Sequence, residues 1–306
     1  MGSNTTADAV TPGTRTIIGT VSTTVLGAEH YSDELVDAVR ASTAAAALAA
    51  GAWFGRGDKN AADAAAVAAM RAELFNAPFA GFVVIGEGEK DEAPMLANGE
   101  ELGSGQGPAC DIAVDPLDGT RLVQEGLPGS VCVIALAPRG ALFDPTDVFY
   151  MDKLISSWPA RGVMNLRATP TENVRNLADA LGKPVSEITV AVLDKPRHVN
   201  LVAELRGMGA RVVLAGEGDV SAAISAATPD GAIDLAMGIG GTPEGVLTAC
   251  AVRALNGFME GRLAPQSDDQ LTMALAAGHN LDRVLTLDDL VSSDQVLFAS
   301  TPVQST

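Results

Sequence analysis

Hydrophobic residues recur at helical spacing in the first quarter of the chain. An apolar face follows Ser32, a residue type that caps helices, and the pattern predicts a helix that ends near Phe54. An alanine-rich amphipathic pattern predicts a second helix over 61–75. Residues 1–31, rich in Thr, Ser, Ala and Gly, predict an N-terminal extension, although 16–25 has the composition of a strand.

Short apolar runs that end in glycine or acidic residues predict buried strands. In the first half of the chain these runs cover 82–85, 111–114 and 131–137. The stretch 144–154 has no such pattern, and we expect an irregular crossover there.

Strands alternate with helices in the second half of the chain. The expected elements are a helix capped by Thr171 that ends at Gly182, a strand over 188–193, a helix over 198–206, a strand over 211–215, a helix through Ile224, a strand over 232–237, and a helix that Thr242 caps and that ends near Leu255. This alternation implies parallel pairing, and ligands bind beyond the carboxyl ends of parallel strands. We therefore expect the loops 194–197, 216–219 and 238–241 to meet at one edge of a sheet.

Composition and charge narrow the possible partners. The 306-residue chain is 47% hydrophobic, which is enough for a sizeable core, and its formal net charge is −18. Nucleic acids and anionic membranes are polyanions, so we expect neither as a partner. A negatively charged substrate would need metal ions or a few basic side chains at its site.

Cysteine and histidine are both scarce. The three cysteines lie in apolar settings without close spacing, which argues against a disulfide framework or a zinc cluster and fits a reducing cytoplasm. With three histidines, any metal site must consist mainly of carboxylates, which favours Mg²⁺ or Mn²⁺ over zinc. Neither a secretory signal pattern nor an apolar run of bilayer length is visible, so we expect a cytoplasmic protein.

The stretch D-P-L-D-G-T at 115–120 is the strongest candidate for chemistry. Asp115 and Asp118 follow an apolar run and could bridge two divalent ions, while Thr120 orients an attacking water. The alternative is a plain polar turn, because Asp, Pro and Gly all favour turns. The next segment has a helical pattern, so backbone N–H groups at Gly119 and Thr120 would favour a phosphate.

A second acidic group follows the strand over 82–85. Glu87, Glu89, Asp91 and Glu92 lie within six positions, and their mutual repulsion favours a bound cation or a shared proton. An ordinary acidic turn at a strand end is the alternative.

Asp58 and Asp63 flank the start of the second helix. The local sequence does not decide between a metal ligand and a first-turn acid that complements the helix dipole. Lys59 beside them could contact phosphate or be solvated.

The loops of the second half add further candidates. Lys195 and Arg197 offer two cations for a phosphate remote from the metals, or they form a solvated basic loop. Glu244 is either a metal ligand or a first-turn acid of its helix, and Asp219 is either a helix cap or an acceptor for a sugar hydroxyl.

Five ordered motifs resemble class II fructose-1,6-bisphosphatase, a bacterial enzyme class that also acts as a sedoheptulose-1,7-bisphosphatase in some organisms. They are G-R-G-D-K-N at 55–60, V-I-G-E-G-E-K-D-E-A-P-M-L at 84–96, D-I-A-V-D-P-x-x-G-T at 111–120, K-P-R-H at 195–198 and G-I-G-G-T-P-E-G-V at 238–246. The resemblance runs in register from about Glu34 to Leu263 and more loosely to Ala299.

The resemblance implies an α/β fold, the αβαβα sandwich shared with class I fructose bisphosphatases and inositol monophosphatases. It implies a metal-binding subdomain at 32–160, a substrate-binding subdomain at 161–306, and a homo-oligomer, either dimer or tetramer. The implied activity is hydrolysis of the 1-phosphate of a sugar bisphosphate with Mg²⁺ or Mn²⁺.

Site residues are implied by the same resemblance. The metal ligands would be Asp63, Glu87, Asp115, Asp118 and Glu244. The substrate contacts would be Asp118, Gly119, Thr120, Tyr150, Lys195, Pro196, Arg197, Glu217, Gly218, Asp219 and Gly241. Lys59, Asp91 and Thr120 would lie near the water and the scissile phosphate.

The chain departs from the family pattern at Asp118, where the family usually has Glu, and at Glu217, where it usually has Asp. Segment 121–128 differs as well. We therefore carry three hypotheses: a sugar-bisphosphate 1-phosphatase acting on fructose 1,6-bisphosphate or sedoheptulose 1,7-bisphosphate, a paralogue for another sugar or cyclitol phosphate, and a catalytically silent regulator that binds sugar phosphates.

Overall fold

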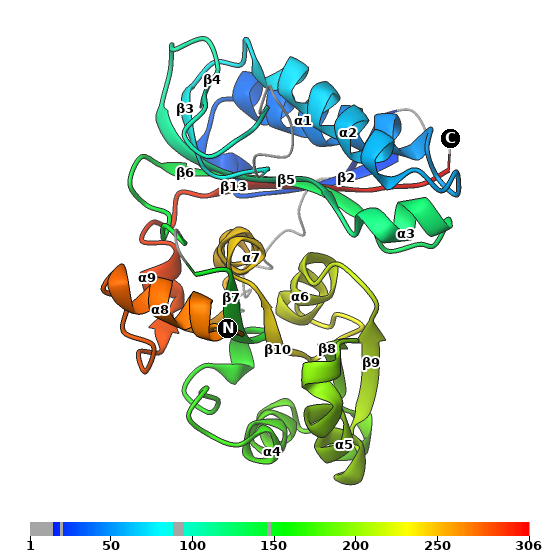
Figure 1. The fold of residues 1–306 in the computed structure, drawn as a ribbon, viewed down its shortest axis with the longest axis vertical. Coiled ribbons are helices and arrows are strands. Elements are labelled where there is room, and N and C mark those ends of the chain that lie inside the picture. Colours follow the sequence, from blue (N-terminus) through cyan, green and yellow to red (C-terminus); the bar gives the residue numbers. More distant parts are fainter. Residues whose placement is uncertain (1–14, 19–20, 88–94, 146–147, 306) are drawn as a thin grey trace, which may run out of the picture.

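Five layers make up the fold of residues 15–18, 21–87, 95–145 and 148–305, which the computed structural model describes. From top to bottom of Figure 1 they are a helix layer, a seven-stranded sheet, a second helix layer, a six-stranded sheet and a third helix layer. This arrangement confirms the expected αβαβα sandwich of the α/β class.

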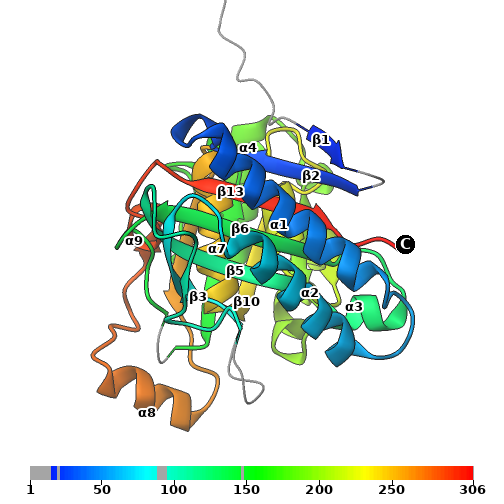
Figure 2. The same ribbon diagram turned by 90° about the horizontal axis from the view of Figure 1, so that it is seen from above.

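The outer helix layer consists of α1 (Asp33–Gly51) and α2 (Lys59–Leu74), which lie across one face of the seven-stranded sheet (Figures 1 and 2). Ser32 caps α1 through a first-turn N–H, as the sequence predicted. Asp58 caps α2 in the same way, with its Oδ1 3.0 Å from the Ala61 nitrogen. The carboxylate of Asp58 therefore serves helix α2.

The seven-stranded sheet joins strands from both ends of the chain. Its order is β1 (Arg15–Ile18), β2 (Val21–Leu26), β13 (Leu297–Pro302), β6 (Val131–Pro138), β5 (Ala109–Asp118), β3 (Ala80–Ile85) and β4 (Glu101–Leu102). Strand β2 pairs with β13, and the buried hydroxyls of Thr23 and Thr301 lie 2.8 Å apart. Part of segment 1–31 is thus a component of this sheet.

The six-stranded sheet has the order β12 (Leu285–Thr286), β11 (Phe258–Leu263), β7 (Tyr150–Ser156), β10 (Leu235–Gly241), β8 (Thr189–Leu193) and β9 (Arg211–Ala215). Strand β8 runs parallel to both β9 and β10, which confirms the parallel pairing predicted for this half. The carboxyl ends of these three strands lie at one edge, so their loops face the same side of the sheet. The predicted division into an extension and two subdomains stays a prediction. In the structure, β7 and β13 each lie in the sheet formed mainly by the opposite half of the chain.

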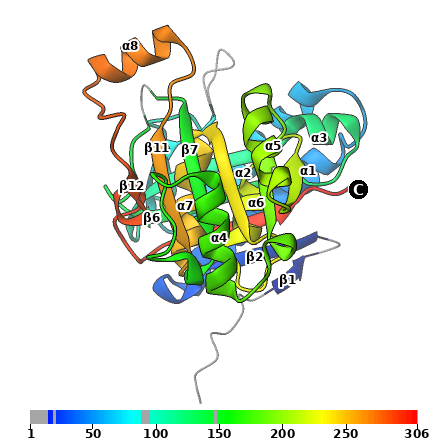
Figure 3. The same ribbon diagram turned by 90° about the horizontal axis from the view of Figure 1, so that it is seen from below.

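The other helices fill the remaining layers. They are α3 (Thr120–Glu125), α4 (Pro170–Leu181), α5 (Val199–Gly207), α6 (Val220–Ala227), α7 (Thr242–Ala254), α8 (Asp268–Ala276) and α9 (Leu287–Leu290). Figure 1 places α6 and α7 between the sheets and α4 and α5 below the six-stranded sheet, while α8 lies apart from the layers in Figures 2 and 3. Every residue of α7 from Gly245 to Val252 is buried, because both sheets cover this helix. No helix in the described ranges is long and apolar enough to cross a membrane.

Three local expectations were wrong. The stretch expected as an irregular crossover contains β7, a strand paired on both sides. Thr169, with Glu172 in a capping box, caps α4 in place of Thr171. Thr242 is the first helical residue of α7 and its hydroxyl caps nothing.

Candidate active site

A cleft of about 960 Å³ lies where the end of β5 meets α2, α3 and α7. Its lining gathers most of the predicted metal and catalytic residues and part of the predicted substrate contacts. They are Lys59, Asp63, Glu87, Asp115, Asp118, Gly119, Thr120, Glu217, Gly218 and Glu244. Residues from distant parts of the sequence, including the end of the seven-stranded sheet and the loop after β9, thus share one cavity.

The D-P-L-D stretch at 115–118 forms the last four residues of β5, so Asp115 and Asp118 lie within the strand and not after it. The register between β5 and β6 shifts between Asp115 and Asp118, so both carboxylates belong to an irregular strand end. Asp115 Oδ1 accepts a hydrogen bond from the Leu117 N–H at 3.0 Å. Gly119 then adopts φ 80°, a left-handed conformation that suits glycine, and the chain turns into α3.

Burial, together with repulsion between carboxylates, raises the pKa values of the acidic residues in the cleft. The pKa of Asp118 is raised well above its usual value, first by burial and then by Asp219 and Glu244. Burial likewise raises the pKa of Asp115, with further increases from Asp118, Glu244 and Glu87. The pKa of Glu244 is also raised, by burial and by Asp219. Bound protons or a bound cation would stabilise such a group of carboxylates.

Two buried oxygens in this group have no hydrogen-bond partner among the described residues. They are Oδ2 of Asp118 and Oε2 of Glu244. A buried carboxylate oxygen without a donor is unstable unless a ligand supplies positive charge. The all-oxygen donor set fits a hard divalent cation. In the described part of the chain, however, no three His, Cys, Asp or Glu side chains already converge into a metal cage.

Glycines allow the carboxylates to fit against the loops of the six-stranded sheet. A Cβ on Gly218 would lie 2.7 Å from Oδ2 of Asp118, and Gly218 has φ +71°. At Gly241 a Cβ would collide with the carboxylate of Glu244. The family resemblance implied that Gly241 contacts substrate, and in the structure Gly241 makes room for the carboxylate of Glu244.

The predicted phosphate loop lies beside the cleft. Arg197 donates to the Ile239 carbonyl from Nε at 3.0 Å and from a terminal nitrogen at 2.7 Å, and its guanidinium lies 5.1 Å from the ring centroid of Tyr150. Tyr150 is paired with Gly241 across β7 and β10. Lys195 Nζ lies 3.5 Å from the Gly216 carbonyl. These residues and Pro196, which begins a short 3-10 helix over 196–198, surround the ends of β9 and β10; within the described residues they are absent from the cleft lining.

Sequence reasoning missed Lys153 as a site residue. Lys153 lies on β7, is buried, forms an ion pair with Asp219, and donates to the Gly241 carbonyl at 3.2 Å. The sequence did contain a signal for a strand here, because Tyr150, Asp152 and Leu154 alternate with residues of the other strand face. The stretch was interpreted as irregular, so this lysine was not assigned to a site.

Arg121 was also missed, although segment 121–128 was noted as unusual. Its backbone N–H donates to Glu217 Oε2 at 2.9 Å, and its Nε lies 3.4 Å from Glu217 Oε1. A terminal nitrogen of Arg121 donates to the Gly216 carbonyl at 3.4 Å. Arg121 therefore connects α3 with the loop after β9, and only the tertiary fold brings the two segments together.

His198 was part of a recognised motif but had no role. Its Nδ1 lies 2.8 Å from the Leu193 carbonyl, and its Nε2 lies 2.8 Å from the Ile239 nitrogen, so Nδ1 donates and Nε2 accepts. Burial lowers the pKa of His198, which fits this neutral form. The ring fastens the end of β8 to β10 and thereby positions Arg197. Asp91, predicted near the scissile phosphate, lies outside the described residues.

Known proteins resemble this chain over most of its length. A family model described as bacterial fructose-1,6-bisphosphatase, glpX-encoded, matches residues 33–306. The chain is 45% identical over 274 residues to fructose-1,6-bisphosphatase 1 class 2 of Escherichia coli strain K12, which covers 85% of this chain and 81% of that protein. Fructose-1,6-bisphosphatase class 2 of Shigella flexneri matches with the same identity and coverage.

Proposed function

The chain belongs to the bacterial fructose-1,6-bisphosphatase family, and we propose that its acidic cleft removes the 1-phosphate of fructose 1,6-bisphosphate, sedoheptulose 1,7-bisphosphate or both, using Mg²⁺ or Mn²⁺. Family membership makes it a phosphoric monoester hydrolase that acts on sugar bisphosphates. A homo-oligomeric state and a cytoplasmic location stay predictions.

One observation carries the proposal. Asp118 Oδ2 and Glu244 Oε2 are buried and lack hydrogen-bond donors within the described ranges, while burial and then repulsion between carboxylates raise the pKa values of both residues. Divalent cations satisfy such oxygens and remove the repulsion. We assign the metal ligands to five of the six acidic residues of the cleft lining: Asp63, Glu87, Asp115, Asp118 and Glu244.

A bound cation would neutralise phosphoryl oxygens and make water more acidic. Thr120 then orients the water. Its hydroxyl lies 3.3 Å from the Leu117 carbonyl, to which it donates, so the Oγ lone pairs face outward as acceptors. A water that donates to this Oγ turns a lone pair towards phosphorus for in-line attack. We assign Lys59 to the phosphate and Asp91 to accepting the proton of that water.

The rest of the substrate would bind along the ends of β9 and β10. The groups proposed there are Tyr150, Lys195, Pro196, Arg197, Asp219 and Gly241. The guanidinium of Arg197 is fixed by two hydrogen bonds to Ile239, so it offers a positioned positive charge to the distal phosphate. A fixed distal phosphate sets the register of the sugar at the cleft.

The test is phosphate release from a panel of sugar and cyclitol phosphates with Mn²⁺. We expect fructose 1,6-bisphosphate or sedoheptulose 1,7-bisphosphate to be the best substrate, with retention of the distal phosphate identified by ³¹P NMR of the product. Release from monophosphates alone would contradict the proposal. Binding without release from any member of the panel would instead identify a silent regulator.

The contact between Arg121 and Glu217 favours a second candidate, a paralogue that acts on another sugar or cyclitol phosphate. Glu217 was predicted to contact substrate, yet both of its carboxylate oxygens face Arg121. A carboxylate held in this way is less available to a sugar hydroxyl. The same panel distinguishes this candidate, because a different sugar phosphate would then give the highest kcat/KM.

A further inference from the structure

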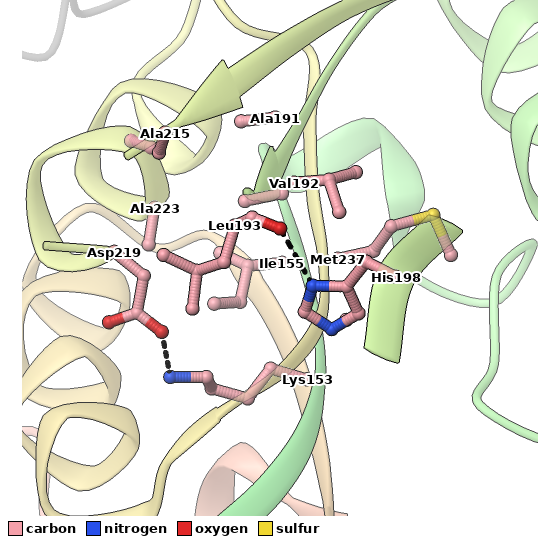
Figure 4. A pocket seen from close by; sticks show the side chains of 13 residues that line it. Lys153, Ile155, Ala191, Val192, Leu193, His198, Ala215, Asp219, Ala223 and Met237 are labelled. Atoms are coloured by element: carbon pink, nitrogen blue, oxygen red, sulfur yellow. Dashed lines mark hydrogen bonds and ion pairs between the residues drawn. The ribbon is translucent and has the colours of Figure 1, made fainter. Parts of the chain in front are cut away.

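A buried ion pair lies next to the acidic cleft. Lys153 and Asp219 point towards each other below a small cavity of about 30 Å³ (Figure 4). The side chain of Lys153 is 5% exposed and that of Asp219 is 18% exposed. Apolar side chains such as Ile155 and Val192 form much of the cavity wall, so little water screens the pair.

Glycines surround the lysine amine. A Cβ on Gly240 would lie 2.7 Å from Nζ, and a Cβ on Gly245 would lie 3.3 Å from Cδ. In the sheet, Lys153 has Gly238 on one side and Gly261 on the other. The chain thus provides space for this one long side chain, in the middle of β7, to reach the end of β10.

The charge of Lys153 acts on more than its direct partner. It lowers the pKa values of Asp118 and Glu244, whereas Asp219 raises both. Lys153 also donates to the Gly241 carbonyl at 3.2 Å, next to the start of α7. A single amine therefore contacts two of the proposed substrate contacts and acts electrostatically on two of the proposed metal ligands.

We propose that Lys153 is a positioning residue that acts as a built-in cation of the acidic cleft. Its ion pair offsets the negative charge of Asp219 beside the metal ligands, and the unbonded oxygens of Asp118 and Glu244 are left for the metal. Its bond to Gly241 keeps the end of β10 in place for the sugar phosphate. This inference rests on the proposed metal-dependent function.

The pairing predicts opposite signs for two substitutions. Lys153→Met removes a positive charge beside the metal ligands, so Mn²⁺ should bind about tenfold more tightly or more. Asp219→Asn leaves that positive charge unpaired, so Mn²⁺ should bind about tenfold more weakly. The double variant Lys153→Met/Asp219→Asn restores the net charge, and its affinity should return to within about threefold of the unmodified chain.

The measurement is Mn²⁺ titration of the full chain, followed by the EPR signal of free Mn²⁺, with no substrate present. Lys183→Met is the matched control, because Lys183 pairs with Asp234 at 2.6 Å in the same half of the chain, and neither residue is in the cleft lining described here. Its Mn²⁺ affinity should be unchanged. Lys153→Arg, which keeps the charge, should also stay near the unmodified affinity, and it provides a folded variant if Lys153→Met does not fold.

A lysine that only fills space would give another pattern. Both single variants would then shift the affinity in the same direction or not at all, and the double variant would show no recovery. Either result would overturn the inference while Mn²⁺ binding by the unmodified chain still supported the proposed function. Failure of the unmodified chain to bind Mn²⁺ would overturn the proposed metal dependence and this inference with it.

Discussion

Strand β5 carries a buried carboxylate near each end, and the two have opposite surroundings. Asp111 is 2% exposed, and its Oδ2 accepts hydrogen bonds from the N–H groups of Gly140 at 2.7 Å and Leu142 at 3.3 Å. Its Oδ1 lies 3.6 Å from Arg139 Nε. Asp118 is 6% exposed, and its Oδ2 has no partner in the described chain.

On this one strand, the comparison distinguishes a carboxylate with a structural role, Asp111, from one with a proposed chemical role, Asp118. Burying a carboxylate is unfavourable unless donors or cations compensate for the lost water. The protein itself satisfies Asp111, which thereby fastens the turn after β6. At Asp118 the protein supplies one backbone donor, from Val220, and the charge of Lys153, but it also places the carboxylates of Asp219 and Glu244 opposite. The pKa of Asp118 is raised all the same, and its unbonded Oδ2 is left for a ligand. We expect the first residue to affect stability and the second to affect activity.

The largest expected effect comes from Asp118→Asn. It should lower kcat by roughly 10²–10³-fold, as removal of one group that organises transition-state charge typically does. Asp111→Asn is the matched change at the other end of β5 and should lower the free energy of unfolding by about 1.5–3 kcal/mol, with kcat nearly unchanged. Steady-state kinetics and urea unfolding of both variants would test the contrast. Equal losses of kcat in Asp118→Asn and Asp111→Asn would contradict it.

Thr120→Ala tests the hydroxyl just beyond Asp118. Turnover should fall by roughly 10²-fold because the attacking water loses its acceptor, whereas Mn²⁺ affinity should persist. Thr228→Ala is the control, since the Thr228 hydroxyl also donates to a backbone carbonyl, that of Ile224 at 2.7 Å, but at the end of α6. Normal turnover in Thr120→Ala would refute the assigned role.

The stability of the metal-free protein should depend on pH at the Asp118 end of the strand. The pKa values of Asp115, Asp118 and Glu244 are raised in the folded state. Their contribution to stability is therefore fully present below the unfolded values of about 4 and is lost as pH rises through the folded values.

Melting temperatures of the metal-free and Mn²⁺-loaded protein from pH 5 to pH 8 would measure this effect. The stabilisation by Mn²⁺ should grow with pH. Metal-free Asp118→Asn should become progressively more stable than the unmodified chain over the same range, because its amide carries no charge. A stability difference that does not change with pH would contradict the assigned repulsion.

The smallest expected effect comes from Arg121. Arg121→Met should raise KM by about two- to fivefold, because Arg121 fastens the loop after β9 that carries the proposed substrate contact Asp219, and a partly exposed ion pair contributes about 0.2–1 kcal/mol. Arg139→Met, beside Asp111, removes an arginine of similar exposure and should leave KM unchanged. A larger increase in KM for Arg121→Met would mean that the guanidinium contacts substrate directly.

Much of the fold follows from local sequence. The cap at Ser32, the apolar runs of β3 and β6, and the alternation that forces β8, β9 and β10 into parallel pairing all depend on neighbouring residues. Prediction failed where two options were locally equivalent. Thr169 and Thr171 both suit a helix cap, and only the position of Glu172 three residues after Thr169 completes the capping box.

The candidate site also has features that the sequence shows and features that it does not. The types of its acidic residues and their order are visible in the sequence, as is the scarcity of histidine that favours hard cations. Local sequence did not decide between Asp58 and Asp63; in the structure Asp58 is used as a helix cap and Asp63 lines the cleft. The partners of Lys153 and Arg121 are also invisible in the sequence, because Asp219 and Glu217 lie more than sixty positions away.

The sequence by itself determined the α/β class, the strand-end positions of the acidic and basic motifs, and the family resemblance, because periodicity and motif order are local properties. Only the tertiary structure decided which buried charges are satisfied. Asp111 and Asp118 are the same residue type on the same strand, and both are buried. Their difference arises from what lies opposite. Two backbone donors and an arginine face Asp111, whereas one backbone donor and two further carboxylates act on Asp118, and this is set by the packing of two sheets against each other.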